Sequence, residues 1–580
     1  MTNAILRGKP DAGNPHVRFD EGEVASAKPR RGSLLYKVFL VSVVVSLAAV
    51  ARATAQELPV WWEPARKKVI SCGWEWKPVR AADFVKYAGR IGETGIDGVG
   101  VYVRAKTLDG RVVYSSSVGD GKDLWTQEMV SDQVPLFARA MSCEGLRESF
   151  VRALGSPEER LDWADDAVWA KIARSMGTLA WLAKEGGFRG LLIDPEDYKS
   201  AKQFKRRPGD EPWRVLAPLA RRRGREVFSA VFREHPEAVI LGYWLFSWNI
   251  EQAASDDPMV SVRCGGDLWA PFVNGILDVM PPTARLVDGN EWAYEAESRR
   301  FEFMMSAVAQ RNCENGLVAP ENRTKYRSQV LPGFGIYLDA YTNARTNSAG
   351  KANHYCLGPD ETGSRTGRFA RNLASALRAS GGYVWLWGER FSWIKYDPEQ
   401  SMGWHVSREL WSERLPGLNS AVRMCANPRR FIELDFPRML RRGAVRDLAA
   451  GKDVVAMSLK ALGKDHDPKN DRQEGLGYFH IGDDKAVPGT HYVVTVEGHG
   501  EGLDAIAYWM DRKDGGWWRW RVPAQCIALR ELPGGRRRGE AVIAVPEGVD
   551  GMQVQFKLHP DPGASCGFDK VFLGKVDLTR

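Results

Sequence analysis

Residues 187–198 read GFRGLLIDPEDY, an apolar run that ends in three acidic residues within four positions. A short apolar run of this kind is typical of a buried strand. Pro195 cannot donate a hydrogen bond to a neighbouring strand, so it stiffens the point at which the chain leaves the sheet. The stretch therefore predicts a strand whose carboxyl end presents Asp194, Glu196 and Asp197.

The same alternation of apolar runs and helical segments extends over most of the chain. Apolar residues recur every three or four positions in 165–187, 212–235 and 365–382, which predicts helices there. Glycine pairs follow two of these segments, where a left-handed cap is favoured. We expect strands at 67–74, 97–103, 147–154, 189–194, 238–246, 284–289, 333–341 and 382–388. Eight parallel strands with helical crossovers predict an α/β protein containing a (β/α)₈ TIM barrel.

The pattern changes after about residue 425. Apart from a short helix expected within 446–463, the remaining runs are short, alternating and separated by turn residues, which predicts an all-β sandwich domain. These runs are 491–498, 505–512, 540–548, 552–560 and 570–578. The segment 508–520, YWMDRKDGGWWRW, places four tryptophans around an Asp-Gly-Gly turn. Two interpretations stay open: rings that stack on sugars, or rings that fill the core or the seam between domains.

The first 55 residues have the order of a secretory signal. A basic leader precedes a thirteen-residue apolar run at 38–50, and small residues follow at 53–55. The run is shorter than the roughly twenty residues of a spanning helix, so we expect cleavage after Ala55, with an uncleaved anchor as the alternative. The predicted organisation is a leader and signal peptide over 1–55, a barrel catalytic domain over 56–425 and a sandwich accessory domain over 426–580. We expect a secreted or periplasmic protein with no stable membrane insertion after cleavage.

Composition narrows the function classes. The 22 tryptophans among 580 residues are about three times average usage, which favours stacking faces for sugars or a large aromatic core. Residues 1–55 hold eight Lys or Arg and four acidic residues, so removing them lowers the formal net charge from +8 to +4. The basic runs lack a nucleic-acid-binding signature. Eight cysteines without a CxxC pair, and nine histidines without HxH or HExxH, predict no metal and no cofactor. The oligomeric state stays open.

The ends of the predicted strands carry the candidate chemistry. Active sites of this fold gather at the carboxyl ends of the strands, and there acidic residues alternate with aromatic ones. Such a rim can grip a pyranose face and supply paired carboxylates, which glycoside hydrolysis requires. Each acid taken alone could instead pair with a rim arginine or cap a helix.

We assign these residues to two roles. The expected catalytic residues are Glu196, Asp194, Asp339 and Glu291. Crowding by neighbouring acids is expected to raise the pKa of Glu196, which makes it the predicted general acid. Asp339 is the predicted nucleophile, and Glu291 is the alternative candidate for that role. The expected substrate-binding residues are Trp74, Glu75, Tyr102, Asp197, Trp244, Trp248, Trp292, Tyr341, Trp387 and Glu389.

Residues 187–198 resemble the fourth-strand motif of family 18 chitinases, which is roughly Gly-Phe-Asp-Gly-x-Asp-x-Asp-x-Glu. The residues in register are Gly187, Phe188, Gly190, Asp194 and Glu196. Arg189 and Leu192 stand where that family has aspartates. The resemblance implies that Glu196 is the proton donor and Asp194 its neighbouring carboxylate. The stretch is also similar to the pattern of family 85 endo-acetylglucosaminidases.

The strand-end acids also resemble those of the large clan of retaining barrel glycosidases. That resemblance implies an acid/base after the fourth strand, at Glu196, and a nucleophile after the seventh, at Asp339. The clan has Asn-Glu and Glu at these places, whereas this chain has Asp-Pro-Glu and Asp.

The sequence thus predicts a secreted glycoside hydrolase that cleaves a poly- or oligosaccharide by carboxylate acid/base catalysis. Two other classes stay open. One is a non-catalytic carbohydrate-binding or scaffold protein on a barrel fold. The other is a lyase or a metal-dependent hydrolase, which the histidine pattern disfavours.

Overall fold

The computed structural model describes most of the chain after its first 66 residues. The described residues are 67–196, 201–249, 267–346, 353, 355–447, 476–481, 490–499, 503–513, 517–527, 529–545, 551–558 and 567–578. By compactness the chain divides into 1–58 and 59–580. The predicted signal, nearly all of the helix predicted within 446–463, and Asp197 lie outside the described residues.

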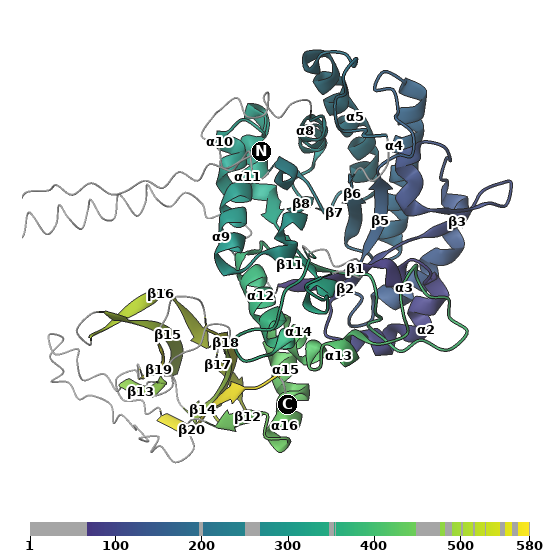
Figure 1. Ribbon diagram of the computed structural model, residues 1–580. Helices are drawn as coiled ribbons and strands as arrows, with labels where there is room; N and C mark the ends of the chain where they lie inside the picture. The colour runs from purple at the N-terminus through teal and green to yellow at the C-terminus, as the bar shows by residue number, and fades with distance from the viewer. Residues whose placement is uncertain are drawn as a thin grey trace, which may run out of the picture. The chain divides into compact units, whose positions relative to one another are not determined.

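Parallel strands within the second unit form a barrel (Figure 1). The strands are β1 (Lys68–Gly73), β2 (Gly98–Val101), β5 (Phe150–Gly155), β6 (Gly190–Asp194), β7 (Val239–Gly242), β8 (Arg285–Asp288), β9 (Val330–Pro332), β10 (Phe334–Tyr337) and β11 (Tyr383–Gly388). They pair in the order β10-β11-β1-β2-β5-β6-β7-β8-β9, and every pairing is parallel.

A single residue, Gly333, separates β9 from β10, so these two are halves of one strand. β9 pairs with β8 and β10 pairs with β11, which closes the ring. The break follows from the sequence, because Pro332 has no backbone N–H and a side chain at Gly333 would crowd Val287. The eight predicted strands and the (β/α)₈ TIM barrel are confirmed.

Helices pack against the barrel strands (Figure 1). The main ones are α2 (Ala81–Gly92), α3 (Val134–Met141), α4 (Asp166–Glu185), α5 (Trp213–Glu234), α8 (Trp269–Val279), α9 (Ser298–Ser306), α11 (Arg323–Gln329) and α12 (Arg365–Ala379). The Asp165 side chain caps α4 by accepting the N–H groups of Ala167 and Val168. Gly187, just past the end of α4, has a positive φ of 76°, which glycine adopts without strain. The three helices predicted from apolar spacing are confirmed.

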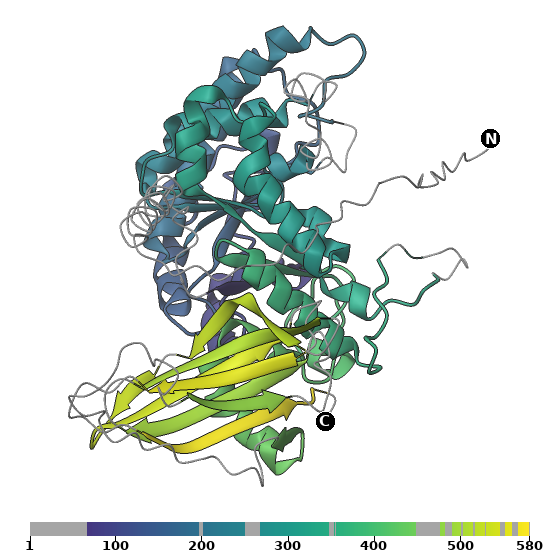
Figure 2. The ribbon, with the colours of Figure 1, turned by 90° about the vertical axis from the view of Figure 1, so that its left-hand side faces the viewer.

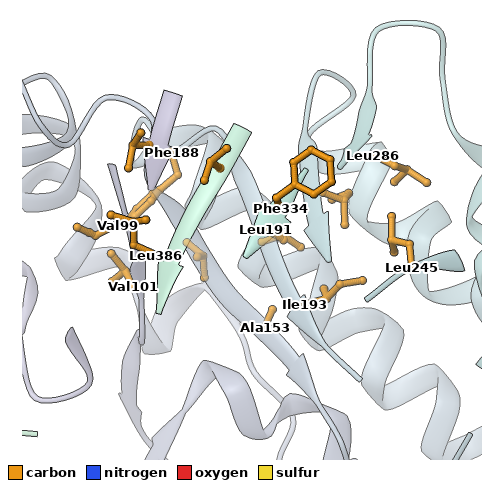
Figure 3. Close-up of a cluster of buried hydrophobic side chains, with 14 of the residues drawn as sticks. Val99, Val101, Ala153, Phe188, Leu191, Ile193, Leu245, Leu286, Phe334 and Leu386 are labelled. Carbon is orange, nitrogen blue, oxygen red and sulfur yellow. The ribbon is translucent and has the colours of Figure 1, made fainter. Parts of the chain in front are cut away.

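Side chains of each strand alternate between two apolar layers. In β6, Leu191 and Ile193 belong to the layer between strands and helices (Figure 3). Leu192 lies in the second layer, together with Phe150 of β5 and Trp385 of β11. Because successive residues of a strand point to opposite faces, Asp194 shares the inner face with Leu192. The alternation thus directs the last side chain of β6 to the inside of the barrel.

The helical part of the chain extends further than predicted. After α13 (Trp411–Arg414) and α14 (Leu418–Ala426), two short helices follow, α15 (Pro428–Leu434) and α16 (Phe436–Arg441). Each has a proline in its first turn, where a missing N–H is tolerated. The expectation that helices stop near residue 425 was therefore wrong, because prolines that mark turns also start helices.

The strands that follow residue 444 form two antiparallel sheets (Figure 2). One contains β12 (Val445–Asp447), β20 (Gly567–Val576), β14 (His491–His499), β18 (Arg536–Ala544) and β17 (Leu529–Leu532). The other contains β13 (Leu476–Ile481), β19 (Gly551–Leu558), β15 (Leu503–Lys513) and β16 (Trp517–Ile527). β14 contacts β15, and β16 contacts β18. The predicted all-β region is confirmed; the four tryptophan side chains of 508–520 lie outside what the structure describes. Across the described ranges, no helix has the length and apolar content that a membrane crossing requires.

Candidate active site

Three carboxylates come together at the carboxyl ends of β6 and β8. Asp194 is the last residue of β6, and the backbone N–H of Glu196 donates to its Oδ1 atom at 3.2 Å. Glu291 begins the short helix η7 (Glu291–Glu295), which follows β8. The negative charges of Glu196 and Asp194 both act on the Glu291 carboxyl group. The structure therefore brings together three of the four predicted catalytic residues.

The Glu291 carboxyl group has an unusual environment. Burial raises the pKa of Glu291 well above its ordinary value, and the charges of Glu196 and Asp194 raise it further. A hydrogen bond from Tyr294 and the charge of Arg152 act in the opposite direction. Its Oε2 atom is buried and has no hydrogen-bond partner among the described residues. Two nearby carboxylates with different environments are the arrangement from which acid/base pairs are built.

Arg152 holds Asp194 in place. It lies on β5 with the same inward parity as Phe150, and its Nη2 atom is 2.6 Å from Asp194 Oδ2. Its Nη1 atom donates to the Tyr243 hydroxyl at 2.9 Å. The guanidinium also lies over the rings of Tyr102, Tyr243 and Trp387, at 4.8, 5.0 and 5.3 Å. This buried cation is thus compensated by one carboxylate and three aromatic faces.

The end of β5 is distorted beside this ion pair. The pairing of β5 with β6 shifts register between Ala153 and Gly155. Leu154, between them, has a φ of 48°, a left-handed value that is strained for a leucine. Such bulges occur at barrel rims near active sites, where they redirect the chain.

A cavity of about 340 Å³ opens at this end of the barrel. Its charged lining residues are Lys77, Asp120, Arg152, Glu158, Asp194 and Glu196, and its aromatic ones are Trp74, Tyr102, Tyr114 and Trp387. Trp74 stacks on Tyr102 with ring centroids 6.5 Å apart and meets Trp387 edge-on at 5.5 Å. Of the predicted residues, Asp194, Glu196, Trp74, Tyr102 and Trp387 therefore share one pocket.

Four other predicted residues, Trp244, Trp248, Trp292 and Glu389, do not line this pocket. Trp244 contacts Trp248 and Trp292, with ring centroids 5.6 and 4.9 Å apart. Glu389 accepts hydrogen bonds from the Trp387 indole N–H and the Tyr337 hydroxyl, both at 3.0 Å.

Three further predicted residues, Asp339, Glu75 and Tyr341, bond to loops or helices and do not line the pocket. The buried Asp339 carboxylate accepts from Arg390 Nε at 2.5 Å and from the backbone N–H of Glu389 at 2.8 Å.

The carboxylate of Glu75 accepts the backbone N–H of Trp393 at 2.9 and 3.0 Å. The Tyr341 hydroxyl accepts from the side chain of Asn372 on α12 at 2.8 Å. Beyond the end of a strand, alternation no longer predicts where a side chain points. Asp339, Glu75 and Tyr341 are therefore not part of the candidate site.

Sequence reasoning missed several residues of the site. Arg152 had a visible signal, since an arginine interrupts the apolar run FVRALG at 150–155. Tyr294, Tyr337 and Tyr355 had none. They form a cluster with ring centroids 5.3 to 6.3 Å apart, and burial together with the charges of Glu295, Glu291, Glu196 and Glu389 raises the pKa of Tyr355.

No group of three or more His, Cys, Asp or Glu side chains in the described ranges is arranged to hold a metal ion. That finding covers only these ranges, so the predicted absence of metal and cofactor stays a prediction. Five cysteines, Cys72, Cys143, Cys313, Cys356 and Cys425, are free thiols.

Fold and site together define a closed (β/α)₈ barrel with a carboxylate cluster and an aromatic pocket at its carboxyl end. No family model and no curated protein matches the chain. A solved glycoside hydrolase is similar at 11% identity and a TM-score of 0.33, over 84% of this chain and 92% of that one. A D-allulose 3-epimerase from Methylomonas sp. is similar at 13% identity and a TM-score of 0.32, over 62% and 99%. The active domain of bacteriophage CBA120 tailspike protein 4 is similar at 13% identity and a TM-score of 0.14, and this chain spans only 14% of its length. The barrel assignment rests on the strand order and its parallel pairing, because TM-scores this low do not support a fold assignment.

Proposed function

We propose that this protein is a glycoside hydrolase whose catalytic carboxylates are Glu196 and Glu291. One observation carries the proposal: the charge of Glu196 acts on the buried carboxyl group of Glu291, beside a pocket with aromatic walls. Glycoside hydrolysis needs one carboxylic acid that protonates the leaving oxygen and one carboxylate that attacks or activates water. This pair supplies both.

The environments of the two carboxyl groups assign their roles. A general acid must hold its proton at the working pH, and the raised pKa of Glu291 meets that requirement. Glu196 is then the nucleophile or the base, so the roles are the reverse of those expected from the sequence. Asp194 accepts the backbone N–H of Glu196 and is itself held by Arg152. It acts as a positioning residue for Glu196.

The pocket walls suit a sugar. The rings of Trp74, Tyr102 and Trp387 line the cavity that Glu196 and Asp194 also line. Aromatic faces bury the apolar face of a pyranose, while carboxylates accept its hydroxyl hydrogens. The order of basic, apolar and small residues in 1–55 supports, as part of the same proposal, a secreted or periplasmic protein.

The test is an activity screen of the mature protein on a panel of polysaccharides and aryl glycosides. Wild type is compared with Glu196→Gln and Glu291→Gln. Each variant is expected to lose at least about a hundredfold in kcat/KM, within the range of a positioned acid or base. The matched control is Glu237→Gln, which changes an exposed glutamate just before β7, at the opposite end of the barrel.

Three other results would redirect the proposal. If the two variants cleave as fast as the control, the catalytic carboxylates lie elsewhere. If wild type cleaves nothing but retains a glycan in a binding assay, the protein is a carbohydrate-binding protein on a barrel fold. If it neither cleaves nor binds any glycan of the panel, the carbohydrate assignment fails.

A further inference from the structure

Among the side chains that the structure describes, three aromatic ones are strongly exposed, and all three follow barrel strands at the carboxyl end of the barrel. Trp292 follows β8 and is 52% exposed, Tyr355 follows β10 and is 48% exposed, and Trp404 follows β11 and is 69% exposed. Leaving a large ring in water forgoes the free energy of burying it. Trp404, the most exposed of the three, was not among the predicted site residues.

The loop that carries Trp404 is fixed against the pocket wall. A side chain at Gly403 would collide with the carbonyl oxygen of Trp74. The loop therefore passes closer to Trp74 than any residue except glycine at position 403 would allow. The guanidinium of Arg408 donates to three backbone carbonyls within 397–400, at 2.7 to 3.0 Å. Trp404 is therefore held in place even though its ring is exposed.

The Trp404 ring is oriented by two neighbours. The imidazole of His405 lies with its centroid 4.1 Å away, tilted by 40°. Trp74 meets the ring edge-on at 6.3 Å. His405 has a φ of 60°, and strained backbone of this kind is found where a site requires a particular geometry. Trp74 also lines the pocket with Glu196, so Trp404 stands next to the pocket wall and outside the pocket itself.

We propose that Trp404 is a sugar-stacking residue outside the pocket, and that the substrate is a glycan chain longer than the pocket can enclose. The inference rests on the proposed function for the class of ligand. The cavity of about 340 Å³ is near the lower end of the roughly 300–1,000 Å³ of ligand pockets. A chain that occupies it beside Glu196 and leaves it past Trp74 meets Trp404 next. A short sugar that stays inside the pocket does not reach that ring.

The test measures binding without cleavage. Glu196→Gln serves as the background, and calorimetry gives its Kd for chitin, cellulose and xylan oligomers of two and six units. Adding Trp404→Ala should weaken binding of the best hexamer by about three- to tenfold, the range of one aromatic contact, and leave the dimer unchanged. Trp404→Phe keeps a ring and should retain most of the hexamer affinity.

Equal weakening of dimer and hexamer, no weakening of the hexamer, or failure of every hexamer to bind would each overturn the inference. The readout separates it from the proposed function. If hexamer binding depends on Trp404 but wild type cleaves no glycan, the hydrolase proposal fails and the stacking site stands. If wild type cleaves glycans but Trp404→Ala does not change how affinity depends on glycan length, the hydrolase proposal stands and the stacking site fails.

Discussion

The guanidinium of Arg152 and the carboxylate of Asp194 form an ion pair at 2.6 Å, and both side chains are largely buried. Both also line the pocket. Removing two charges from water has a high free-energy cost, which their mutual attraction offsets only when the geometry is good. Because Asp194 also accepts the backbone N–H of Glu196, this pair links the stability of the barrel to the position of a proposed catalytic residue.

Arg152→Met should destabilise the protein strongly. The change leaves the Asp194 carboxylate buried without its partner, so we expect the free energy of unfolding to fall by about 3–5 kcal/mol. Urea unfolding followed by tryptophan fluorescence measures the change. The control is Arg80→Met, which breaks a surface pair with Asp83 and should cost about 0–1 kcal/mol. Equal losses for the two variants would show that the buried pair has no special weight.

Asp194→Asn should move the alkaline limb of the pH profile of kcat/KM to lower pH. The negative charge of Asp194 helps to raise the pKa of Glu291, so removing it lowers that pKa. The proposed acid then loses its proton at lower pH, and the uncompensated charge of Arg152 acts in the same direction. A limb that stays in place or moves to higher pH would contradict the role of Glu291.

Glu75→Gln should change how stability depends on pH. Burial raises the pKa of Glu75 from 4.5 to about 8. Between these two values the folded state keeps a proton that the unfolded state has lost. The free energy of unfolding of wild type therefore falls as the pH rises from about 4.5 through about 8. Glutamine does not titrate, so the variant should gain relative to wild type over that window. At about 1.4 kcal/mol per unit of pKa, the gain is several kcal/mol, measured by urea unfolding at pH 5, 7 and 9. A difference that is constant over this range would refute the assignment.

Gly403→Ala should disturb both stability and activity. The added methyl group would collide with the Trp74 carbonyl oxygen, so the loop and Trp74 must move apart. Overpacking of this kind costs about 1–3 kcal/mol, and displacement of Trp74 should raise KM. Gly358→Ala is the control, because a side chain there meets nothing within 4 Å. Identical thermal midpoints and KM values for the two variants would contradict the close packing of this loop.

The eight strands could be predicted because each is buried on both faces, and such strands read as apolar runs between helical segments. The position of Asp194 followed for the same reason, since it continues the alternation of β6. The break between β9 and β10 was missed because a proline and a glycine read as the start of a strand. In the structure they divide one strand between two neighbours.

The pairing of side chains could not be predicted from strand ends alone. Asp339 and Glu75 lie at the expected ends, but each carboxylate bonds to the backbone of the loop after β11. Glu291 and Glu196 are 95 positions apart in the sequence, and the parallel order β6-β7-β8 brings the ends of their strands to one rim. Trp404 lies 16 residues beyond its strand, so its place beside Trp74 depends on the path of the whole loop.

The most direct test of the central claim, that Glu291 is the proton donor and Glu196 its partner, compares leaving groups. A dinitrophenolate leaves without being protonated, whereas a sugar leaves only when its glycosidic oxygen receives a proton. Loss of the general acid therefore slows mainly the cleavage of the oligosaccharide. We expect Glu291→Gln to retain far more of the wild-type kcat/KM on a dinitrophenyl glycoside than on the matching oligosaccharide. We expect Glu196→Gln to lose both alike. Equal losses of Glu291→Gln on the two substrates, or selective retention by Glu196→Gln, would contradict the account.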